Sequence, residues 1–492
     1  MLLLVFCAGT LPWLLYEHFL WNVDAGLYIL TSKALLAGEG YAYLGEPFVL
    51  RPPGLPVLLA PVLALFGTDF AALNLATNAM GIAAVLLLFL YARPALGAGS
   101  SALLAAVTWL HPVFREVCNS TLSDAPGAAL LFGGLLAERR LWSRRSLGSA
   151  LGLGLLVAGG VYVRSLLVFL LPAFALSWLW RRGFRGERPL RPVHAAVALG
   201  LPLLLLAPWW LRNAAVPLPR PALETAMASQ DTAMWHRDKA DPDSPRLGWT
   251  EVGARVPPNA ARLAAELASG LAEPALEEGA EEAPGAVSDG RARIALGALL
   301  VVLVILGAWR SRSPALLFFL ANLAILSVWH TARLRLVLPA YLIGLPVLAA
   351  LVTRVVARWS SPVVGRGLTA VLLVALGVTH GLRAPDWNRN TTTQLQRESL
   401  CRDLESLELD PQGGFASEWG WNDALYLDRP VRAFRHRVHR QGATVGDLRE
   451  LGVRYVIAPH PSRQYAALAA ELEARATLLA QRGRLRAYDL GP

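Results

Sequence analysis

A carboxylate stands close behind the first apolar segment of this sequence. Asp24 follows an apolar run that ends at Leu20, and Tyr28 comes four residues later in "DAGLYILTSKALLAG". Residues four apart share one face of a helix, and the apolar spacing predicts an amphipathic helix along a membrane interface. A carboxylate within hydrogen-bond reach of a hydroxyl can act as a general base. The alternative for Asp24 is a helix cap that accepts backbone amide hydrogen bonds.

Several basic residues also stand at the ends of apolar segments, as Asp24 does. Arg51 precedes two prolines in "LRPPGLP", which force an extended turn. A guanidinium group binds phosphate through paired N–H donors, so Arg51 is a candidate anion clamp; its alternative is an arginine that extends toward lipid headgroups. Further candidates stand at the ends of later apolar segments, namely Arg164 in "VYVRSLL", Arg212 in "PWWLRN", and His330, Arg333 and Arg335 in "WHTARLRLVLP".

A second group of acids lies in "REVCNSTLSDAPGAAL". Glu116 and Asp124 bracket a short polar loop, and Asp124 stands where the next helix is expected to begin. Two acids in such a loop could position a sugar or bind a cation, whereas the alternative for Asp124 is an N-cap. The three cysteines have no metal-ligand spacing, so neither a zinc cluster nor a disulfide framework is predicted.

The composition predicts that membrane helices position these groups. The 492 residues are 54% hydrophobic and only 17% charged, whereas soluble domains average roughly 25% charged residues. Apolar segments of about 20 residues cross a bilayer as helices. We predict about eleven spans, near residues 1–20, 71–92, 99–112, 125–137, 147–162, 165–180, 193–211, 294–309, 314–329, 336–353 and 363–381, and a segment at 52–66 that enters without crossing.

Alternate loops differ in their basic content, which predicts the orientation. Fifteen arginines fall in "YARPALGAG", "ERRLWSRRS", "RRGFRGERPLRP", "WRSRS" and "TRVVARWSSPVVGR". Lys and Arg accumulate in cytoplasmic loops, so the N-terminus is expected inside and the loops 21–51, 113–124 and 212–293 outside. We assign the net charge of +10 to these cytoplasmic loops rather than to nucleic-acid binding. The 46 basic residues include only two lysines, which indicates the codon bias of a GC-rich bacterial genome and hence a bacterial source.

The composition after residue 381 becomes that of a soluble domain. The runs "GGFAS", "RPVRAF", "VRYVIAP" and "RLRAYDL" predict strands, "TVGDLRELG" predicts a helix capped by threonine, and "SRQYAALAAELEARATLLAQRG" predicts a longer helix that ends at Gly483. The expected fold is an all-α polytopic membrane domain over 1–381, followed by a small extracytoplasmic α/β domain over 382–492. The acidic run "EPALEEGAEEAPGAVSDG" in the 212–293 loop is expected to be a mobile, solvated spacer.

The order of these motifs resembles the GT-C superfamily of integral membrane glycosyltransferases, and most nearly its bacterial branch akin to protein O-mannosyltransferases and lipid A aminoarabinose transferases. The resemblance covers residues 1–381 and rests on the early Asp and Tyr followed by "GEGY", "RPPGLP", "TLSDAP", "VYVRS", "APWWLRN" and "RLRLVLPAYL". It implies a polyprenyl-phosphate sugar donor, inversion at the anomeric carbon and an acid in the first outer loop as the base. Asp24 occupies that position.

The same resemblance implies further assignments. Arg51 matches a basic residue near the donor phosphate, and the second outer-loop acid corresponds to Asp124 or Glu116. In the aminoarabinose-transferase branch an acid commonly precedes the basic-Pro-Pro element and helps to bind a metal, but Leu50 stands there in this sequence. We therefore assign no cofactor, and a divalent cation stays open.

The expected activity is sugar transfer from a polyprenyl-phosphate donor to a hydroxyl of a protein, lipid or glycan acceptor, at the outer face of the bacterial cytoplasmic membrane. Asp24 is the expected base. The expected donor-phosphate ligands are Arg51, Arg164, Arg333 and Arg335, and the other expected substrate contacts are Tyr28, Glu116, Asp124, Arg212 and His330.

Three other functions remain open: a transporter or flippase for lipid-linked sugars, a polymerase or ligase of lipid-linked glycans, and a non-catalytic scaffold. Transporters place ionisable groups near the middle of the membrane, often in repeated halves. Here the candidate acids gather at one face and the sequence has no internal repeat. This pattern favours the enzyme.

Overall fold

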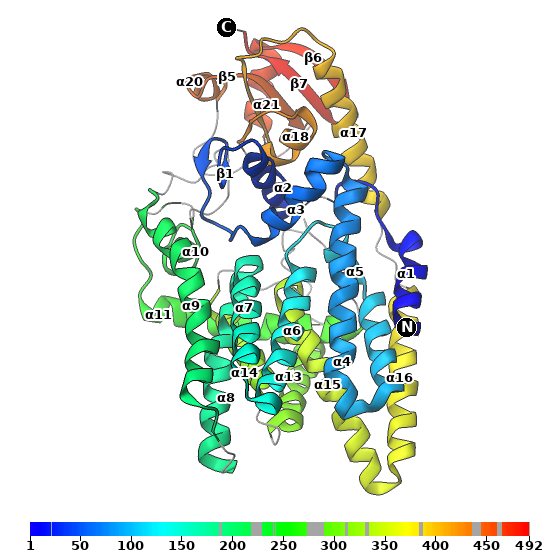
Figure 1. Cartoon of the computed structure of the whole chain (residues 1–492). Helices are drawn as coiled ribbons and strands as arrows, with labels where there is room; N and C mark the ends of the chain where they lie inside the picture. Colours follow the sequence, from blue (N-terminus) through cyan, green and yellow to red (C-terminus); the bar gives the residue numbers. More distant parts are fainter. Residues whose placement is uncertain are drawn as a thin grey trace.

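In a computed structural model, the chain forms a helical body that carries a small sheet domain at one end (Figure 1). The structure describes residues 1–20, 22–185, 189–217, 229–239, 241, 243–272, 290–309, 313–329, 334–382, 387–434, 444–459 and 465–491. The acidic run, apart from Gly290, lies outside the described residues, and so do His330 and Arg333.

Six helical segments of the described chain are long and apolar enough to cross a membrane. They are Phe70–Leu110, Ser165–Gly183, Pro192–Ala215, Gly290–Trp309, Arg335–Trp359 and Pro362–Leu382. Four shorter apolar helices accompany them: α1 (Leu2–Leu14), α3 (Gly54–Phe66), α7 (Leu147–Val163) and α14 (Pro314–Val328). A polytopic helical protein is therefore supported, whereas the figure of eleven crossings stays a prediction.

Besides these four short helices, the helical body consists of the long segments and of the elements that join or flank them. They are α2 (Val23–Leu36), α4 (Phe70–Leu110), α5 (Pro112–Cys118), α6 (Asp124–Arg144), η1 (Ser165–Phe169), α8 (Leu170–Arg185), α9 (Pro192–Ala215), α10 (Gln230–Trp235), α11 (Trp249–Ala254), α12 (Val256–Ala272), α13 (Gly290–Trp309), α15 (Leu334–Trp359) and α16 (Pro362–Leu382). The predicted segments 71–92 and 99–112 are two arms of α4, interrupted at Gly97. Its φ of 78° is a left-handed value that glycine adopts without steric cost.

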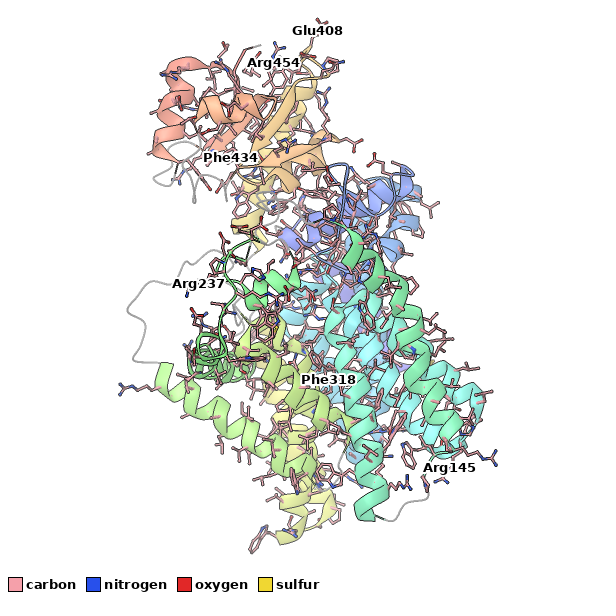
Figure 2. The ribbon with its side chains drawn as sticks, turned by 90° about the vertical axis from the view of Figure 1, so that its left-hand side faces the viewer. Arg145, Arg237, Phe318, Glu408, Phe434 and Arg454 are labelled. Atoms are coloured by element: carbon pink, nitrogen blue, oxygen red, sulfur yellow. The ribbon has the colours of Figure 1, made fainter. Side chains whose placement is uncertain are left out.

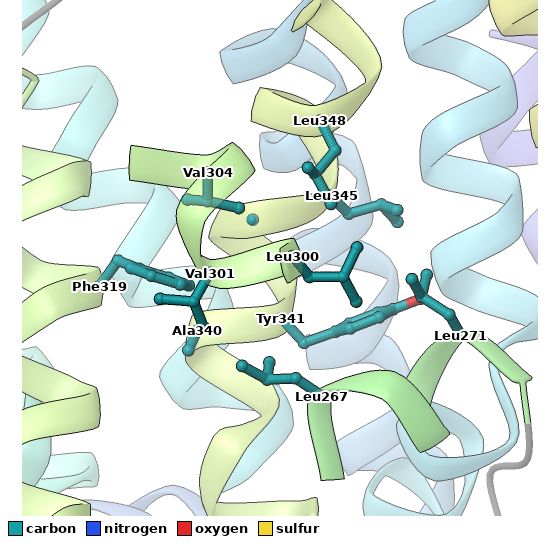
Figure 3. A pocket seen from close by; sticks show the side chains of 11 residues that line it. Leu267, Leu271, Leu300, Val301, Val304, Phe319, Ala340, Tyr341, Leu345 and Leu348 are labelled. Carbon is teal, nitrogen blue, oxygen red and sulfur yellow. The ribbon is translucent and has the colours of Figure 1, made fainter. Parts of the chain in front are cut away.

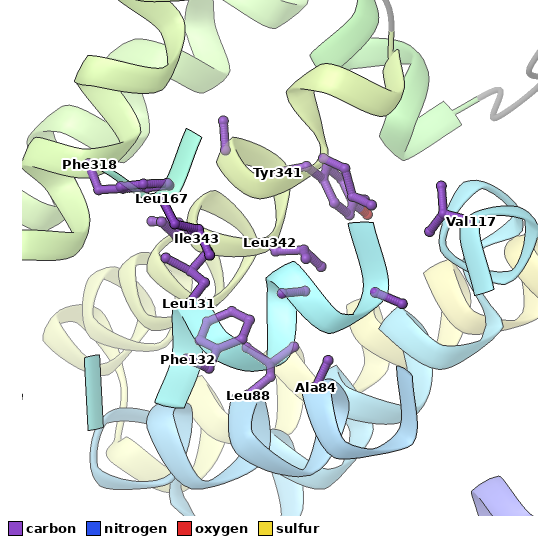
Figure 4. Packing of buried hydrophobic residues seen from close by; sticks show 14 of the residues in the cluster. Ala84, Leu88, Val117, Leu131, Phe132, Leu167, Phe318, Tyr341, Leu342 and Ile343 are labelled. Atoms are coloured by element: carbon purple, nitrogen blue, oxygen red, sulfur yellow. The ribbon is translucent and has the colours of Figure 1, made fainter. Parts of the chain in front are cut away.

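Apolar side chains from several helices hold the body together. Leu88 of α4 and Phe132 of α6 pack near Ile343 of α15 and Phe318 of α14, and all four are buried (Figure 4). Close-packed contacts of this kind, rather than burial from water, hold helices together inside a bilayer. The packing brings helices that are far apart in sequence to fixed positions at one end of the body.

The two ends of the body differ in character. Arg145, in the arginine-rich loop after α6, lies at the end remote from Phe434 and Arg454 of the C-terminal domain (Figure 2). The helix α2 lies at the other end, between the body and the C-terminal domain (Figure 1). The sequence predicted an amphipathic helix along the membrane interface. Most residues of α2 are instead buried, so the protein covers this helix on most of its sides.

The C-terminal domain is a five-stranded mixed sheet with helices. The strands β3 (Gly414–Ser417), β4 (Val431–Ala433), β5 (Val453–Pro459), β6 (Thr477–Arg482) and β7 (Leu485–Asp489) follow the order β4-β3-β5-β7-β6. β3 pairs in parallel with β4 and β5, and β7 pairs antiparallel with β5 and β6. The helices are α17 (Trp387–Glu405), α18 (Gly420–Leu427), α20 (Val445–Glu450) and α21 (Ala466–Arg475).

Local predictions for this domain hold with one correction. The four predicted strands are confirmed, and Thr444 caps α20 through a hydrogen bond from the Asp447 amide, as expected. The predicted helix up to Gly483 is wrong, because α21 ends at Arg475 and the following residues form β6. Gly483 (φ 55°) turns the chain so that β6 pairs with β7, and this pairing overrides the helical composition of the segment.

A buried ion pair anchors α18 to α17. Arg397 Nη1 donates to both carboxylate oxygens of Asp423, at 2.8 and 2.7 Å, and both side chains are buried. We expect Asp423→Ala to destabilise the domain by about 3–5 kcal/mol, because it removes the carboxylate that is hydrogen-bonded to a buried guanidinium. Pulse proteolysis of the full chain in urea measures this loss. Asp403→Ala, which removes a more exposed partner of Arg482, is the control and should cost less than about 1 kcal/mol; equal losses would contradict the assignment.

Candidate active site

The N-terminus of α2 places a carboxylate inside the protein. The Asn22 side chain caps the helix by accepting the Asp24 amide at 3.0 Å, so Asp24 is not the cap. Asp24 lies in the first turn and is buried. One turn later the Tyr28 hydroxyl donates to Ser123 Oγ at 3.2 Å. The helical spacing therefore does present both side chains toward the body, as the sequence predicted.

Two arginines from distant segments hold Asp24. Arg51 donates from Nε and Nη2 to Asp24 Oδ1, at 3.2 and 3.0 Å. Arg335, at the start of α15 and 311 positions later in the chain, donates to Asp24 Oδ2 and to the Asn22 side chain. Arg51 is therefore paired within the protein rather than extended toward lipid headgroups.

The second acid joins the same network. Asp124 Oδ1 lies 2.8 Å from Arg164 Nη1, and its Oδ2 lies 3.9 Å from Arg335 Nε. Ser123 occupies the N-cap position of α6, and its hydroxyl also accepts from Arg164 at 3.4 Å. Arg335 thus reaches both carboxylates.

Glu116, the other acid of this loop, accepts a hydrogen bond from Ser120 Oγ through its backbone carbonyl, at 2.6 Å.

The network carries more positive than negative charge. Three guanidinium groups, those of Arg51, Arg164 and Arg335, face two carboxylates, those of Asp24 and Asp124. Their side chains are only 2–20% exposed. Charges in such surroundings need partners, because removal from water is costly. Among the described residues, the network therefore has one surplus positive charge, which an anion can balance.

Ionisation in this site follows from burial and charge. Burial alone would raise the pKa of Asp24, but the positive charges of Arg51 and Arg335 outweigh it and hold the pKa of this carboxyl well below its usual range. Burial raises the pKa of Tyr28, so its hydroxyl stays protonated and donates to Ser123. While both arginines remain on it, Asp24 is therefore ionised at neutral pH and is a weak base.

Backbone contacts frame the segment that carries Arg51. The hydroxyl of Tyr41, in the "GEGY" motif, donates to the Arg51 carbonyl at 3.0 Å. Arg212 donates to the carbonyls of Tyr41 and Phe48, both at 2.9 Å, on the two sides of the hairpin β1 (Ala42–Tyr43) and β2 (Glu46–Pro47). Arg212 thus holds this hairpin, whereas the motif "PWWLRN" predicted a substrate contact for it.

Several of these supporting residues were not candidates in the sequence. Asn22 stands where a helix cap belongs, and Ser123 and Tyr41 lie inside quoted motifs, so a local signal was present for all three. Gln230 carries no such signal, yet its Nε2 donates to the Leu50 carbonyl at 3.3 Å and to Ser165 Oγ at 3.2 Å. Gln230 thus connects Leu50 with Ser165, which are the chain neighbours of Arg51 and Arg164.

The donor set does not fit a divalent cation. Within the part of the chain that the structure describes, no three His, Cys, Asp or Glu side chains gather as metal ligands. Both carboxylates of the network are paired with guanidinium groups, and Leu50 supplies no oxygen ligand from its side chain.

An apolar cavity lies apart from this network. It has a volume of about 20 Å³ and is lined by side chains that include Leu267, Leu300, Val304, Tyr341 and Leu348 (Figure 3). This volume is close to that of a single water molecule, and no charged side chain lines it. The cavity is therefore not where the chemistry of the charged network takes place.

The chain is similar to known proteins in sequence and in fold. Residues 50–211 match the family described as dolichyl-phosphate-mannose-protein mannosyltransferase, a stretch that contains Arg51, Asp124 and Arg164. The comparison with curated proteins finds no significant match. The structure of ArnT from Cupriavidus metallidurans bound to undecaprenyl phosphate is similar with a TM-score of 0.64 at 14% identity, over 100% of this chain and 98% of that one. The chain has the GT-C fold.

A second GT-C structure is similar over much of the chain. The archaeal oligosaccharyltransferase AglB from Archaeoglobus fulgidus, in complex with an inhibitory peptide and a dolichol-phosphate, gives a TM-score of 0.53 at 13% identity. The similarity covers 96% of this chain and 71% of that one. The resemblance to GT-C proteins that the motifs predicted is thus confirmed. In the ArnT comparison, the GT-C similarity also extends into the C-terminal domain.

Proposed function

We propose that this chain is an inverting glycosyltransferase. It would move a sugar from a polyprenyl-phosphate donor to an acceptor hydroxyl at the outer face of the bacterial cytoplasmic membrane. The observation that carries this proposal is the buried network in which Arg51 and Arg335 meet at Asp24. The ArnT and AglB structures hold undecaprenyl phosphate and dolichol-phosphate, which supports a lipid-linked phosphate as the donor class for this fold.

The chemistry assigns one role to each part of the network. The acceptor hydroxyl oxygen attacks the anomeric carbon while its proton passes to Asp24. The bond from the anomeric carbon to the phosphate oxygen breaks, and the polyprenyl phosphate leaves with the additional negative charge. Attack opposite this leaving group inverts the anomeric centre. Arg51, Arg164 and Arg335 stabilise the charge that develops on the phosphate.

The pairing at Asp24 gives the reaction an order. Before the donor binds, Arg51 and Arg335 lie on the carboxylate and lower its basicity. A donor phosphate competes for the same guanidinium groups and balances the surplus positive charge of the network. As the arginines turn toward the phosphate, the pKa of Asp24 rises toward its ordinary value. The base therefore gains proton affinity only when the donor is present, which protects the site from unproductive proton transfer.

The remaining predicted residues keep supporting roles in this proposal. Tyr28 and Asp124 orient the sugar or the arginines beside it, and Arg212 fixes the hairpin that precedes Arg51. Glu116 and His330 stay assigned to substrate and Arg333 to the donor phosphate, on the resemblance of the motifs alone. The acceptor is a hydroxyl-bearing protein, lipid or glycan.

We also propose the domain boundaries and the orientation. Residues 1–381 form the membrane domain with a cytoplasmic N-terminus, and residues 382–492 form an extracytoplasmic domain. The arginine-rich end of the body, marked by Arg145, lies away from the C-terminal domain, which supports this assignment (Figure 2). Labelling of single cysteines with membrane-impermeant reagents tests it; a cytoplasmic position for residue 24 would contradict it.

The activity itself is tested with a panel of radiolabelled polyprenyl-phosphate monosaccharides. Membranes that contain the protein should transfer label from at least one donor to a hydroxyl-bearing acceptor. Movement of an intact lipid-linked sugar across the membrane without transfer would favour the flippase. Transfer only of preassembled oligosaccharides would favour the polymerase or ligase.

Arg51→Ala should weaken use of the donor much more than use of the acceptor. A hydrogen bond to a charged group contributes about 1.5–3 kcal/mol, so we expect kcat/KM for the donor to fall about 10–100-fold. Arg237→Ala removes an outer, exposed arginine paired with Glu251 and serves as the control with unchanged kinetics. Initial rates at varied donor and acceptor concentrations measure both effects. A change confined to acceptor saturation would contradict the phosphate role.

A further inference from the structure

The C-terminal domain touches α2 close to the proposed base. Gly26 follows Asp24 by two residues, and a Cβ atom at Gly26 would lie 2.6 Å from Cε3 of Trp421 on α18. Real carbon atoms do not approach so closely, so the indole ring lies directly on the backbone of α2. Trp421 is only 2% exposed. Its position is therefore fixed by packing on all sides.

A second contact joins α18 to the other end of α2. Lys33 Nζ lies 2.7 Å from Asp428 Oδ1, at the residue that ends α18. Between these two points, Leu425 of α18 belongs to the same buried apolar cluster as Leu27 and Ile29 of α2. The two helices thus pack against each other, with contacts near both ends of α18.

The helix α18 is itself held firmly by its own domain. A Cβ atom at Gly420 would lie 2.3 Å from the Val431 carbonyl oxygen, so α18 begins against the backbone of β4. The buried pair of Asp423 with Arg397 fixes it to α17. A position set by the sheet is therefore transmitted through α18 to α2.

We propose that Trp421 is a positioning residue for Asp24, so that the C-terminal domain is part of the catalytic unit. This inference rests on the proposed function. From the side of the helical body, α2 is held by the Tyr28 bond to Ser123 and by the arginines on Asp24. From the side of the C-terminal domain, the Trp421 ring sets the position of α2 relative to the helical body. A displacement of about 1 Å in a reacting group can cost about 100-fold in rate.

A double-mutant cycle at the contact tests the inference. Alanine is a better helix former than glycine by about 1 kcal/mol, so Gly26→Ala alone would strengthen an isolated α2. Here the added methyl group collides with Trp421 and should displace the helix. We expect kcat to fall at least about 10-fold while KM for the donor changes less than about 3-fold. The double variant Gly26→Ala with Trp421→Leu should recover at least about 5-fold in kcat relative to Gly26→Ala, because the collision is removed.

A matched control separates positioning from general stability. Phe434 is buried against Tyr465, in an apolar cluster whose members all come from the C-terminal domain. Phe434→Leu removes an aromatic side chain as Trp421→Leu does, and kcat should stay within about 3-fold. The conservative Trp421→Phe should keep most of the activity, and it replaces Trp421→Leu in the cycle if the latter does not accumulate. If the effects of Gly26→Ala and Trp421→Leu on kcat simply multiply in the double variant, the inference is overturned. Equal losses of kcat in Phe434→Leu and Trp421→Leu would overturn it as well.

Hydrogen exchange of the full-length protein gives a readout that needs no substrate. Trp421→Leu should accelerate amide exchange in residues 23–36, whereas Phe434→Leu should not. Unchanged exchange in these residues contradicts the contact. If the wild-type protein transfers no sugar, the proposed function fails while this measurement still tests the contact. If the wild type is active and the cycle is additive, only the positioning role fails.

Discussion

Asp24→Asn should lower kcat for sugar transfer by about 10²–10⁴-fold, the usual contribution of a general base. Asparagine has nearly the same shape and still fits between Arg51 and Arg335, but its amide cannot take the acceptor proton. The substitution also removes a negative charge from the network. The donor phosphate then meets less competition for the guanidinium groups, so KM for the donor should stay the same or fall while kcat collapses.

The control for this variant is Asp69→Asn. Asp69 caps α4 by accepting the Ala72 amide at 3.1 Å and is exposed, and asparagine caps helices about as well as aspartate. Turnover of Asp69→Asn should equal that of the wild type. Both variants should reach the membrane in equal amounts, measured by quantitative blotting. Full turnover by Asp24→Asn would remove Asp24 from the mechanism.

Arg335→Gln should have the second largest effect, because Arg335 is the described side chain that reaches Asp24, Asn22 and Asp124 together. We expect kcat/KM for the donor to fall about 100-fold through loss of a charged phosphate ligand. Loss of this positive charge also raises the pKa of Asp24 from its depressed value toward the usual value of about 3.9.

The pH profile separates these two consequences. Asp24 must be ionised to accept a proton, so a raised pKa moves the acid limb of kcat/KM to higher pH. The variant should lose activity on acidification before the wild type does. Arg354→Gln, on the same helix α15, removes an arginine that donates to the Gly307 carbonyl and should leave the acid limb unchanged. A profile of Arg335→Gln that parallels the wild type would mean that Arg335 does not set the ionisation of Asp24.

Local signals predicted much of this protein from the sequence. Apolar segments of helical length gave the helical body, and short apolar runs gave four of the five strands of the C-terminal sheet. The spacing of Asp24 and Tyr28 placed both on one face of α2, because helical geometry fixes the direction of residues four apart. The threonine before α20 identified its cap in the same way.

Predictions that depended on distant partners were less complete. In the sequence, Arg212 and Arg335 both stand at the ends of apolar segments, and the expected roles were a substrate contact for Arg212 and a donor-phosphate ligand for Arg335. In the structure Arg212 holds the hairpin before Arg51, whereas Arg335 binds Asp24. The segment that forms β6 has a helical composition, yet pairing with β7 decides its conformation. The roles of the two arginines and the conformation of β6 each depend on a contact with another segment of the chain. The local sequence pattern does not show which segment that is.

The sequence by itself determined which chemical groups are available and which helices and strands carry most of them, because periodicity and caps act over a few residues. Only the tertiary structure decided that one arginine would bridge two acids, that Asn22 and not Asp24 would cap α2, and that α18 would lie on α2. The physical reason is that helix packing sets distances between residues 311 positions apart, and these distances decide which charges pair.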